Sequence, residues 1–89
     1  MEFEWDERKA HINEAKHGIS FYEATEVFGD SYSSCVPDPD HSHDEERYLL
    51  FGISERRKYL VVSFTQNSNK LRIISARHMT RQERKAYEQ

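Results

Sequence analysis

The sequence has 89 residues, 33% charged and 36% hydrophobic, which fits one small folded domain over residues 1–89 and excludes a membrane-spanning helix. Residues 1–46 carry 3 basic and 13 acidic side chains, a net charge of −10, whereas residues 47–89 carry 10 basic and 3 acidic ones, a net charge of +7. The acidic N-terminus lacks the apolar run of a secretory signal, and the single cysteine, Cys35, excludes an internal disulfide, so we expect a cytoplasmic protein.

Two short helices are predicted in the first third of the chain. The first begins after Asp6, which can cap it, and ends at His17-Gly18, where glycine can adopt the left-handed conformation. The second begins after Ser20, which forms a capping box with Glu23, and Gly29 ends it. Its apolar face, which we expect to lie on the core, consists of Phe21, Ala24, Thr25 and Phe28.

Strands are predicted next, because the hydrophobic pattern changes from helical spacing to alternation. A short strand is expected at residues 31–36, followed by a loop at 37–44 that is rich in proline and aspartate. Longer strands follow at 47–54, 58–65 and 70–77, and the short turns between them make neighbouring strands antiparallel.

A final helix is predicted after Thr80, which has capping-box spacing with Glu83. Only Ala86 and Tyr87 are apolar in this helix, so we expect it to lie loosely on the surface. The predicted class is therefore α+β, with two N-terminal helices, an antiparallel meander of three to four strands, and a C-terminal helix.

The loop at residues 37–44 holds two candidate metal ligands, His41 and His43. Their spacing matches no strong motif, and a solvated loop is the simpler interpretation. We therefore expect neither a metal nor another cofactor, and we keep a metal-binding regulator as a third hypothesis.

The basic half of the chain has the residue types that metal-free RNA cleavage requires. Such cleavage needs groups that move protons to and from the 2′- and 5′-oxygens, and fixed cations that stabilise the negative charge of the phosphorane. The basic residues of this half are Arg47, Arg56, Arg57, Lys58, Lys70, Arg72, Arg77, Arg81, Arg84 and Lys85, with His78 among them. The alternative is a basic sheet face that only balances the acidic half.

The two arginines of the last predicted strand can share one site only if both side chains lie on the same face of the sheet. Side chains alternate between the faces of a regular strand, so Arg72 and Arg77 point to opposite faces. They share a site only if the strand ends or bulges near residues 75–76.

Several blocks of the sequence form a pattern that runs from about residue 3 to residue 88. The blocks are Phe3-Glu4-Trp5-Asp6, Lys9, Asn13, the run from Lys16 to Ala24, Phe28, Glu46-Arg47-Tyr48, Gly52, the run from Arg72 to Arg77, Thr80, Glu83 and Tyr87. In this order they resemble the BrnT family of toxins. No block is a common short motif, which makes the resemblance specific.

The resemblance implies a RelE-like fold and the toxin of a type II toxin–antitoxin system, an endoribonuclease that inhibits translation. It implies a BrnA-like ribbon-helix-helix antitoxin as partner and contact with operator DNA only through that antitoxin. The site residues that it implies are Arg72, Arg77, Arg47, Glu46 and Tyr87. His78 stands where the family usually has another basic residue, and either Glu46 or His78 is expected to accept the proton. The alternative function is a catalytically weak module that docks an antitoxin through its basic sheet face.

Overall fold

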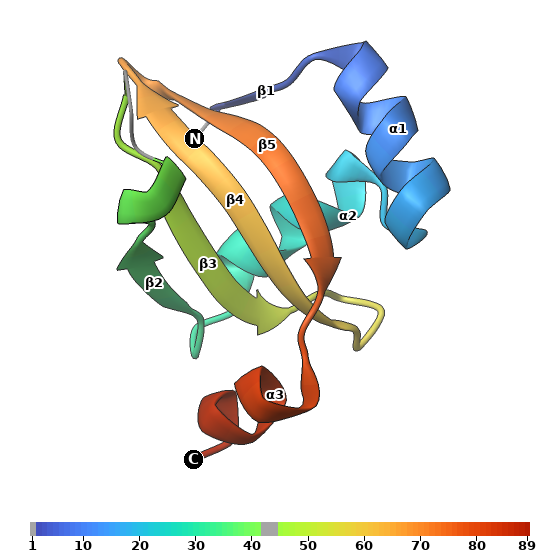
Figure 1. Ribbon diagram of the computed structural model, residues 1–89, viewed down its shortest axis with the longest axis vertical. Coiled ribbons are helices and arrows are strands. Elements are labelled where there is room, and N and C mark those ends of the chain that lie inside the picture. The colour runs from blue at the N-terminus through green and yellow to red at the C-terminus, as the bar shows by residue number, and fades with distance from the viewer. Residues whose placement is uncertain (1, 42–44) are drawn as a thin grey trace.

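Two helices cover one face of a five-stranded sheet in the computed structural model, which describes residues 2–41 and 45–89 (Figure 1). The strands are β1 (Glu2–Glu4), β2 (Ser34–Pro37), β3 (Tyr48–Ile53), β4 (Tyr59–Asn67) and β5 (Lys70–His78), in the spatial order β1-β5-β4-β3-β2. The helices are α1 (Glu7–His17), α2 (Phe21–Glu26) and α3 (Arg81–Tyr87), with short 3₁₀ turns η1 (Val27–Gly29) and η2 (Pro39–His41). The predicted α+β class is confirmed.

Helix α1 begins and ends at the predicted residues, whereas α2 begins as predicted but ends at Glu26, and the chain continues as the 3₁₀ turn η1 up to the predicted end at Gly29. The Asp6 carboxylate caps α1 by accepting hydrogen bonds from the backbone amides of Lys9 and Arg8, and these bonds lower the pKa of Asp6. Gly18 follows α1 with φ of 71°, the left-handed conformation expected at that position. Ser20 caps α2 by accepting a hydrogen bond from the Glu23 amide at 3.0 Å.

The second half of the capping box predicted for α2 is wrong. The Glu23 carboxylate does not turn back to Ser20 but accepts hydrogen bonds from the Ser54 hydroxyl at 2.9 Å and the Lys58 ammonium at 3.3 Å. Glu23 is only 3% exposed, so its charge needs polar partners, and the β3–β4 turn provides them. The residue therefore ties α2 to the sheet.

The core lies between the sheet and the two N-terminal helices. From the sheet it includes Leu50, Leu60, Val62, Phe64, Leu71, Ile73 and Ala76, and from the helical segment Ile19, Phe21, Ala24 and Val27. Burying one such large apolar side chain contributes about 1.5–3 kcal/mol. The predicted core residue Phe28 is partly buried, with its ring centroid 5.0 Å from that of Phe64.

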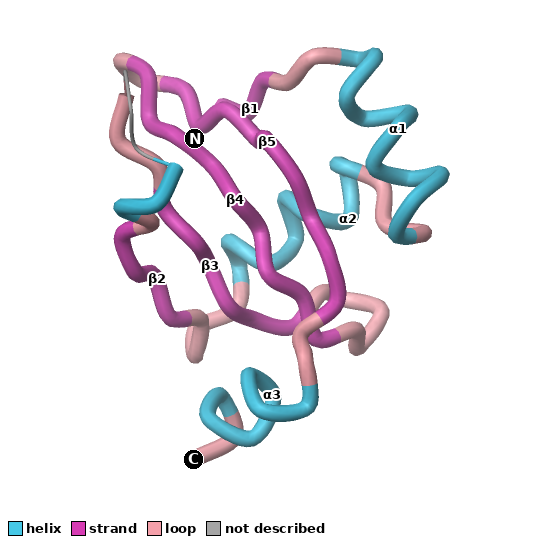
Figure 2. Tube along the Cα trace, in the orientation of Figure 1, coloured by secondary structure: helices cyan, strands magenta, loops and turns pink. Residues whose placement is uncertain are grey.

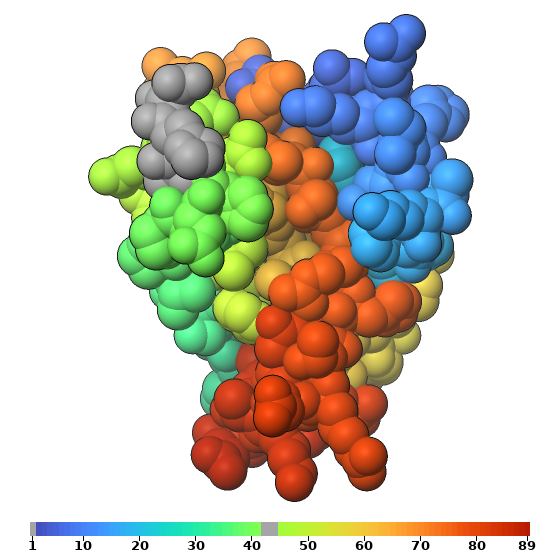
Figure 3. Space-filling view, in the orientation of Figure 1, coloured from blue at the N-terminus to red at the C-terminus, as the bar shows by residue number. Residues whose placement is uncertain are grey.

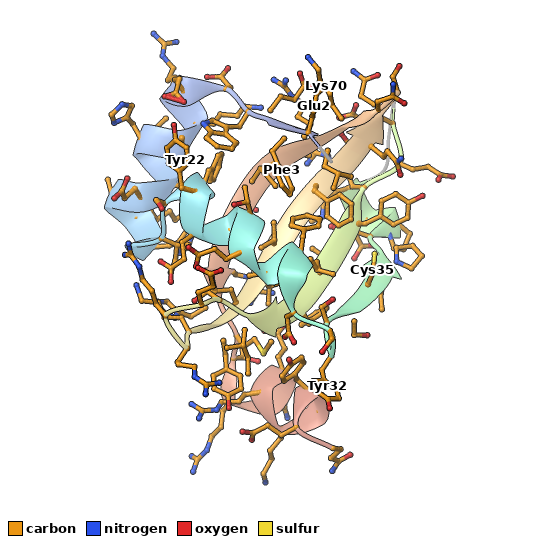
Figure 4. The ribbon with its side chains drawn as sticks, turned by 180° about the vertical axis from the view of Figure 1, so that it is seen from behind. Glu2, Phe3, Tyr22, Tyr32, Cys35 and Lys70 are labelled. Atoms are coloured by element: carbon orange, nitrogen blue, oxygen red, sulfur yellow. The ribbon has the colours of Figure 1, made fainter. Side chains whose placement is uncertain are left out.

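Strand β1 is absent from the predicted meander. It pairs in parallel with β5, so that Glu2 lies opposite Lys70 and Phe3 opposite Leu71 (Figure 4). Three residues are too few to show an alternating pattern, and the partner strand lies near the other end of the sequence. The sheet is therefore an antiparallel meander extended by one parallel edge strand.

Strand β2 begins three residues later than predicted, at Ser34 instead of residue 31. Asp30 holds the preceding residues in a turn, because its side chain accepts a hydrogen bond from the Tyr32 amide and its carbonyl accepts one from the Ser33 amide, both at 3.0 Å. The predicted loop after β2 contains η2, and His43 lies outside the described residues.

Helix α3 lies at one end of the sheet and buries none of its own residues (Figure 2). Its predicted capping box is complete, since Thr80 and Glu83 each accept a hydrogen bond from the other's amide. Polar and aromatic contacts hold the helix: the Tyr87 hydroxyl donates to Asp30, and the Arg84 guanidinium lies 3.9 Å from the centroid of the Tyr59 ring. The expected surface position is confirmed, and these contacts attach the helix to the rest of the domain.

In the described part of the chain, no helix has the length and apolar character needed to cross a membrane.

Candidate active site on the open face of the sheet

A β-bulge in β5 meets the condition for a shared arginine site. Ser63 of β4 pairs with Ser75, but the next residue of β4, Phe64, pairs with Ile73, so Ile74 is the extra residue. One extra residue reverses the alternation of side chains beyond it. Arg72 and Arg77 therefore lie on the same face of the sheet.

This face is the one opposite α1 and α2, and we call it the open face. Its central residues are Val61, Ser63 and Thr65 of β4, with Arg72, Ser75 and Arg77 opposite them on β5. Figure 3 views the open face, and the surface is hollowed between the green segment around η2 and the orange strand β5.

The hollow contains a pocket of about 290 Å³ that gathers side chains from four parts of the chain. Its lining residues are Asp38, His41, Arg47, Leu49, Ser63, Ile74, Ser75 and Arg77. Two guanidinium groups and an imidazole thus border one small cavity. A planar guanidinium suits a phosphate, and an imidazole can transfer a proton near neutral pH, so this pocket is the candidate active site.

Arg77 is held at the pocket by α3. Its guanidinium donates hydrogen bonds to both carboxylate oxygens of Glu83, at 2.8 and 3.0 Å, and one to the carbonyl of His78 at 3.1 Å. These Glu83 bonds raise the pKa of Arg77, and the same pair lowers the pKa of Glu83 to about 2. The arginine is half-buried and fixed in position, which suits a group that stabilises charge on a bound phosphate.

The η2 turn adds His41, a residue that the sequence analysis considered only as a metal ligand. Its Nδ1 lies 2.9 Å from Oδ2 of Asp38. Asp38 in turn donates its backbone N–H to the carbonyl of Arg47 at 2.8 Å, which aligns the turn with the start of β3. The spacing Asp38-x-x-His41 in a proline-containing turn is the signal that could have predicted this pair.

Arg47 and Arg77 are the two predicted site residues that line the pocket. Arg72 shares the open face but is not part of the lining, and its guanidinium lies 3.9 Å from the Glu4 carboxylate. The bulge therefore brings Arg72 and Arg77 to one side of the sheet, with Arg72 nearer to β1.

Glu46 lies away from the pocket. It accepts a hydrogen bond from the Tyr48 hydroxyl at 2.7 Å, which raises the pKa of Tyr48. The Tyr48 ring stacks on Phe64, with 5.6 Å between the ring centroids, and packs against the core on the helix-covered side.

His78 and Tyr87 also lie outside the pocket. His78 is exposed at the end of β5, opposite Leu60, whose side chain belongs to the helix-covered core. Tyr87 lines a separate cavity of about 270 Å³ beside Asp30. Burial and the hydrogen bond to Asp30 raise the pKa of Tyr87 to about 12.

Within residues 2–41 and 45–89, the side chains form no cluster of three or more His, Cys, Asp or Glu residues suited to a metal ion. His41 belongs to the pair with Asp38, and its proposed co-ligand His43 lies outside the described residues.

Comparisons with known proteins agree with this fold. A family model described as "Ribonuclease toxin, BrnT, of type II toxin-antitoxin system" matches residues 5–83. The structure is similar to the crystal structure of the Brucella abortus ribonuclease toxin BrnT, with a TM-score of 0.71 and 25% identity over 91% of this chain and 99% of that chain. No curated protein matches the sequence significantly. All residues that line the pocket lie inside the matched region.

Proposed function

The chain belongs to the BrnT family of ribonuclease toxins of type II toxin–antitoxin systems, and from this membership we propose that its open-face pocket cleaves RNA without a metal ion. RNA is the substrate class of the family, and an antitoxin is the partner that such a system implies.

The observation that carries the proposal is the meeting of Arg47 and Arg77 in one pocket on the open face. When the 2′-oxygen attacks phosphorus, the phosphorane gains negative charge, and the guanidinium groups of these two arginines stabilise that charge. The bulge at Ile74 adds Arg72 to the same face, where it can bind the RNA backbone beside the scissile phosphate. The reaction leaves a 2′,3′-cyclic phosphate and a 5′-hydroxyl.

RNA cleavage in excess EDTA tests this assignment. We expect the wild-type chain to cut a long RNA and leave 5′-hydroxyl ends, and we expect Arg77→Ala and Arg47→Ala each to lower the rate by ~10²–10³, the usual cost of removing one charge-stabilising donor. The matched control is Arg56→Ala, which removes an exposed arginine from the β3–β4 turn and leaves the rate unchanged. Cleavage that requires added Mg²⁺, or full activity of Arg77→Ala, contradicts the proposal.

The partner in this proposal is a BrnA-like ribbon-helix-helix antitoxin that covers the open face in the cytoplasm. In the complex, the antitoxin and not this chain contacts the operator DNA. The net charge of +7 in residues 47–89 supports an acidic docking segment in such a partner. The double reversal Arg47→Glu/Arg77→Glu should weaken the complex by ten-fold or more in a titration with purified antitoxin. Unchanged affinity places the interface on another surface.

A further inference from the structure

His41 has the position and the partner of a proton-transfer group. Its side chain is 64% exposed, so a bound RNA can reach it, and it borders the same pocket as Arg47 and Arg77. The Asp38 carboxylate beside it is only 12% exposed. An accessible imidazole therefore contacts a mostly buried carboxylate, next to the two arginines that are suited to bind a phosphate.

The contact with Asp38 determines which ring nitrogen is available. Nδ1 lies 2.9 Å from Oδ2 of Asp38, so the neutral ring carries its proton on Nδ1 and donates it to the carboxylate. This leaves Nε2 with a lone pair that can accept a proton. The turn itself is fixed by two backbone bonds, from the His41 amide to the Asp38 carbonyl at 3.2 Å and from the Asp38 amide to the Arg47 carbonyl at 2.8 Å.

We propose that His41 is the catalytic base of RNA cleavage in this pocket and that Asp38 is the residue that positions it. The proposal rests on the function assigned above. Neutral Nε2 accepts the proton of the 2′-hydroxyl, the 2′-oxygen forms its bond to phosphorus, and the bond from phosphorus to the 5′-oxygen breaks. The leaving 5′-oxygen takes a proton from water, and the hydroxide that remains removes the proton from His41.

The charged groups around His41 agree with this role. Asp38 lies on the same turn, Arg47 precedes β3 and Arg77 comes from β5. The Asp38 carboxylate can stabilise the imidazolium that forms during the reaction, and the arginines can bind the phosphate. Glu46 and His78, the proton acceptors expected from the sequence, lie outside the pocket.

The test uses a fluorogenic RNA oligonucleotide of mixed sequence, cleaved in EDTA from pH 5 to pH 9. We expect His41→Gln to lower kcat by ~10²–10⁴, the range for a lost acid–base group, with KM changed less than three-fold. The wild-type rate falls at acidic pH as the imidazole becomes protonated, and the variant loses this fall. The matched control is His11→Gln, an exposed histidine of α1, which keeps the wild-type rate and pH profile.

Two further variants separate catalysis from structure. Imidazole added to the buffer should restore part of the rate of His41→Ala, because the free base can enter the space left by the side chain. Asp38→Asn should lower kcat and leave KM unchanged, because the amide no longer stabilises the imidazolium.

The outcomes also separate this inference from the function on which it rests. If Arg77→Ala loses activity while His41→Gln and a second variant, His41→Asn, keep the wild-type rate and pH profile, the pocket assignment stands and the base assignment is overturned. A loss of activity in His41→Ala that imidazole does not restore also overturns it. RNA that stays intact with the wild-type chain overturns both proposals.

Discussion

The side chain of Asn13 pairs with the backbone of Ala76 as a neighbouring strand would. Its Nδ2 donates a hydrogen bond to the Ala76 carbonyl at 2.9 Å, and its Oδ1 accepts one from the Ala76 amide at 3.1 Å. Strand β1 pairs with β5 only as far as Arg72. Beyond Arg72, the outer edge of β5 faces α1 and no longer faces a strand. A buried amide on α1 thus holds the strand segment that carries Arg77.

We expect Asn13→Ala to lower the free energy of unfolding by about 2–3 kcal/mol, because it leaves the polar groups of Ala76 and the carbonyl of Ile19 buried without this partner. Urea denaturation at pH 7 measures the loss. The control on the same helix is Ile12→Ala, which removes a side chain that is 60% exposed and should change stability by less than about 0.5 kcal/mol. Equal stability of the two variants would show that the Asn13 bonds contribute little.

Gly52 lies at a point where the sheet and the helical segment approach closely. A Cβ atom at this position would lie 2.8 Å from Cγ1 of Val27 and 3.0 Å from Oδ2 of Asp30. We therefore expect Gly52→Ala to destabilise the protein by about 1–3 kcal/mol, as overpacking does in other cores. Gly29→Ala is the matched control, since a Cβ there has no neighbour within 4 Å, and thermal melting compares the two. A melting temperature for Gly52→Ala at or above that of Gly29→Ala contradicts the prediction.

The Arg77–Glu83 pair makes stability depend on acidic pH. The Arg77 hydrogen bonds lower the pKa of Glu83 from 4.5 to about 2, so the carboxylate stabilises the fold fully above pH 4.5 and loses this effect as the pH falls to about 2. Because solvent screens the pair, we expect Glu83→Gln to cost only about 1 kcal/mol at pH 7.

Urea midpoints of both proteins from pH 7 to pH 2.5 check this expectation. The difference between them should be constant above pH 4.5 and shrink below it. Glu14→Gln, on the exposed part of α1, should show no such change. A difference that stays the same at every pH would mean that Glu83 gains nothing from Arg77.

The contact between Tyr87 and Asp30 makes stability depend on alkaline pH. Burial and the hydrogen bond raise the pKa of Tyr87 from 10 to about 12, so the neutral phenol stabilises the fold fully below pH 10 and its effect is lost between pH 10 and pH 12. Tyr87→Phe should therefore melt at a lower temperature than wild type at pH 7, and the two should converge above pH 10. Tyr22→Phe, which changes an exposed tyrosine, serves as the control and should match wild type throughout. Parallel melting curves for Tyr87→Phe and wild type across this range would contradict the prediction.

Local features of the fold could be predicted from the sequence. The caps at Asp6, Ser20 and Thr80 and the left-handed Gly18 depend on residues one to four positions away, so their sequence pattern contains the physical cause. The three long strands of the meander also appear within one or two residues of their predicted bounds.

Features that depend on distant partners could not be predicted in this way. Strand β1 forms because Phe3 lies beside Leu71. The carboxylate of Glu23 turns away from Ser20 because Ser54 and Lys58 donate hydrogen bonds to it. Alternation alone places Arg72 and Arg77 on opposite faces, and only the β4–β5 register reveals the extra residue.

The candidate site was only partly accessible to sequence analysis for the same reason. Arg47 and Arg77 were found by residue type and by resemblance, and the structure adds that they border one pocket. His41 was considered as a metal ligand and the solvated loop was preferred, because nothing in the sequence states that its turn lies beside β5. The spacing of Asp38 and His41 is present in the sequence, but their place beside Arg47 and Arg77 is seen only in the structure.

The pairing of β1 with β5 has a consequence for the order in which the molecule is made. Residues 2–4 leave the ribosome well before their partners, residues 70–72, are synthesised. Contacts between such distant parts of a chain form late and slow the folding of small proteins. The strand that carries Arg72 and Arg77 is therefore held between β4, its neighbour in the sequence, and β1, which is far from it in the sequence. A ribosome has to synthesise β5 before the surface proposed to bind RNA can take shape.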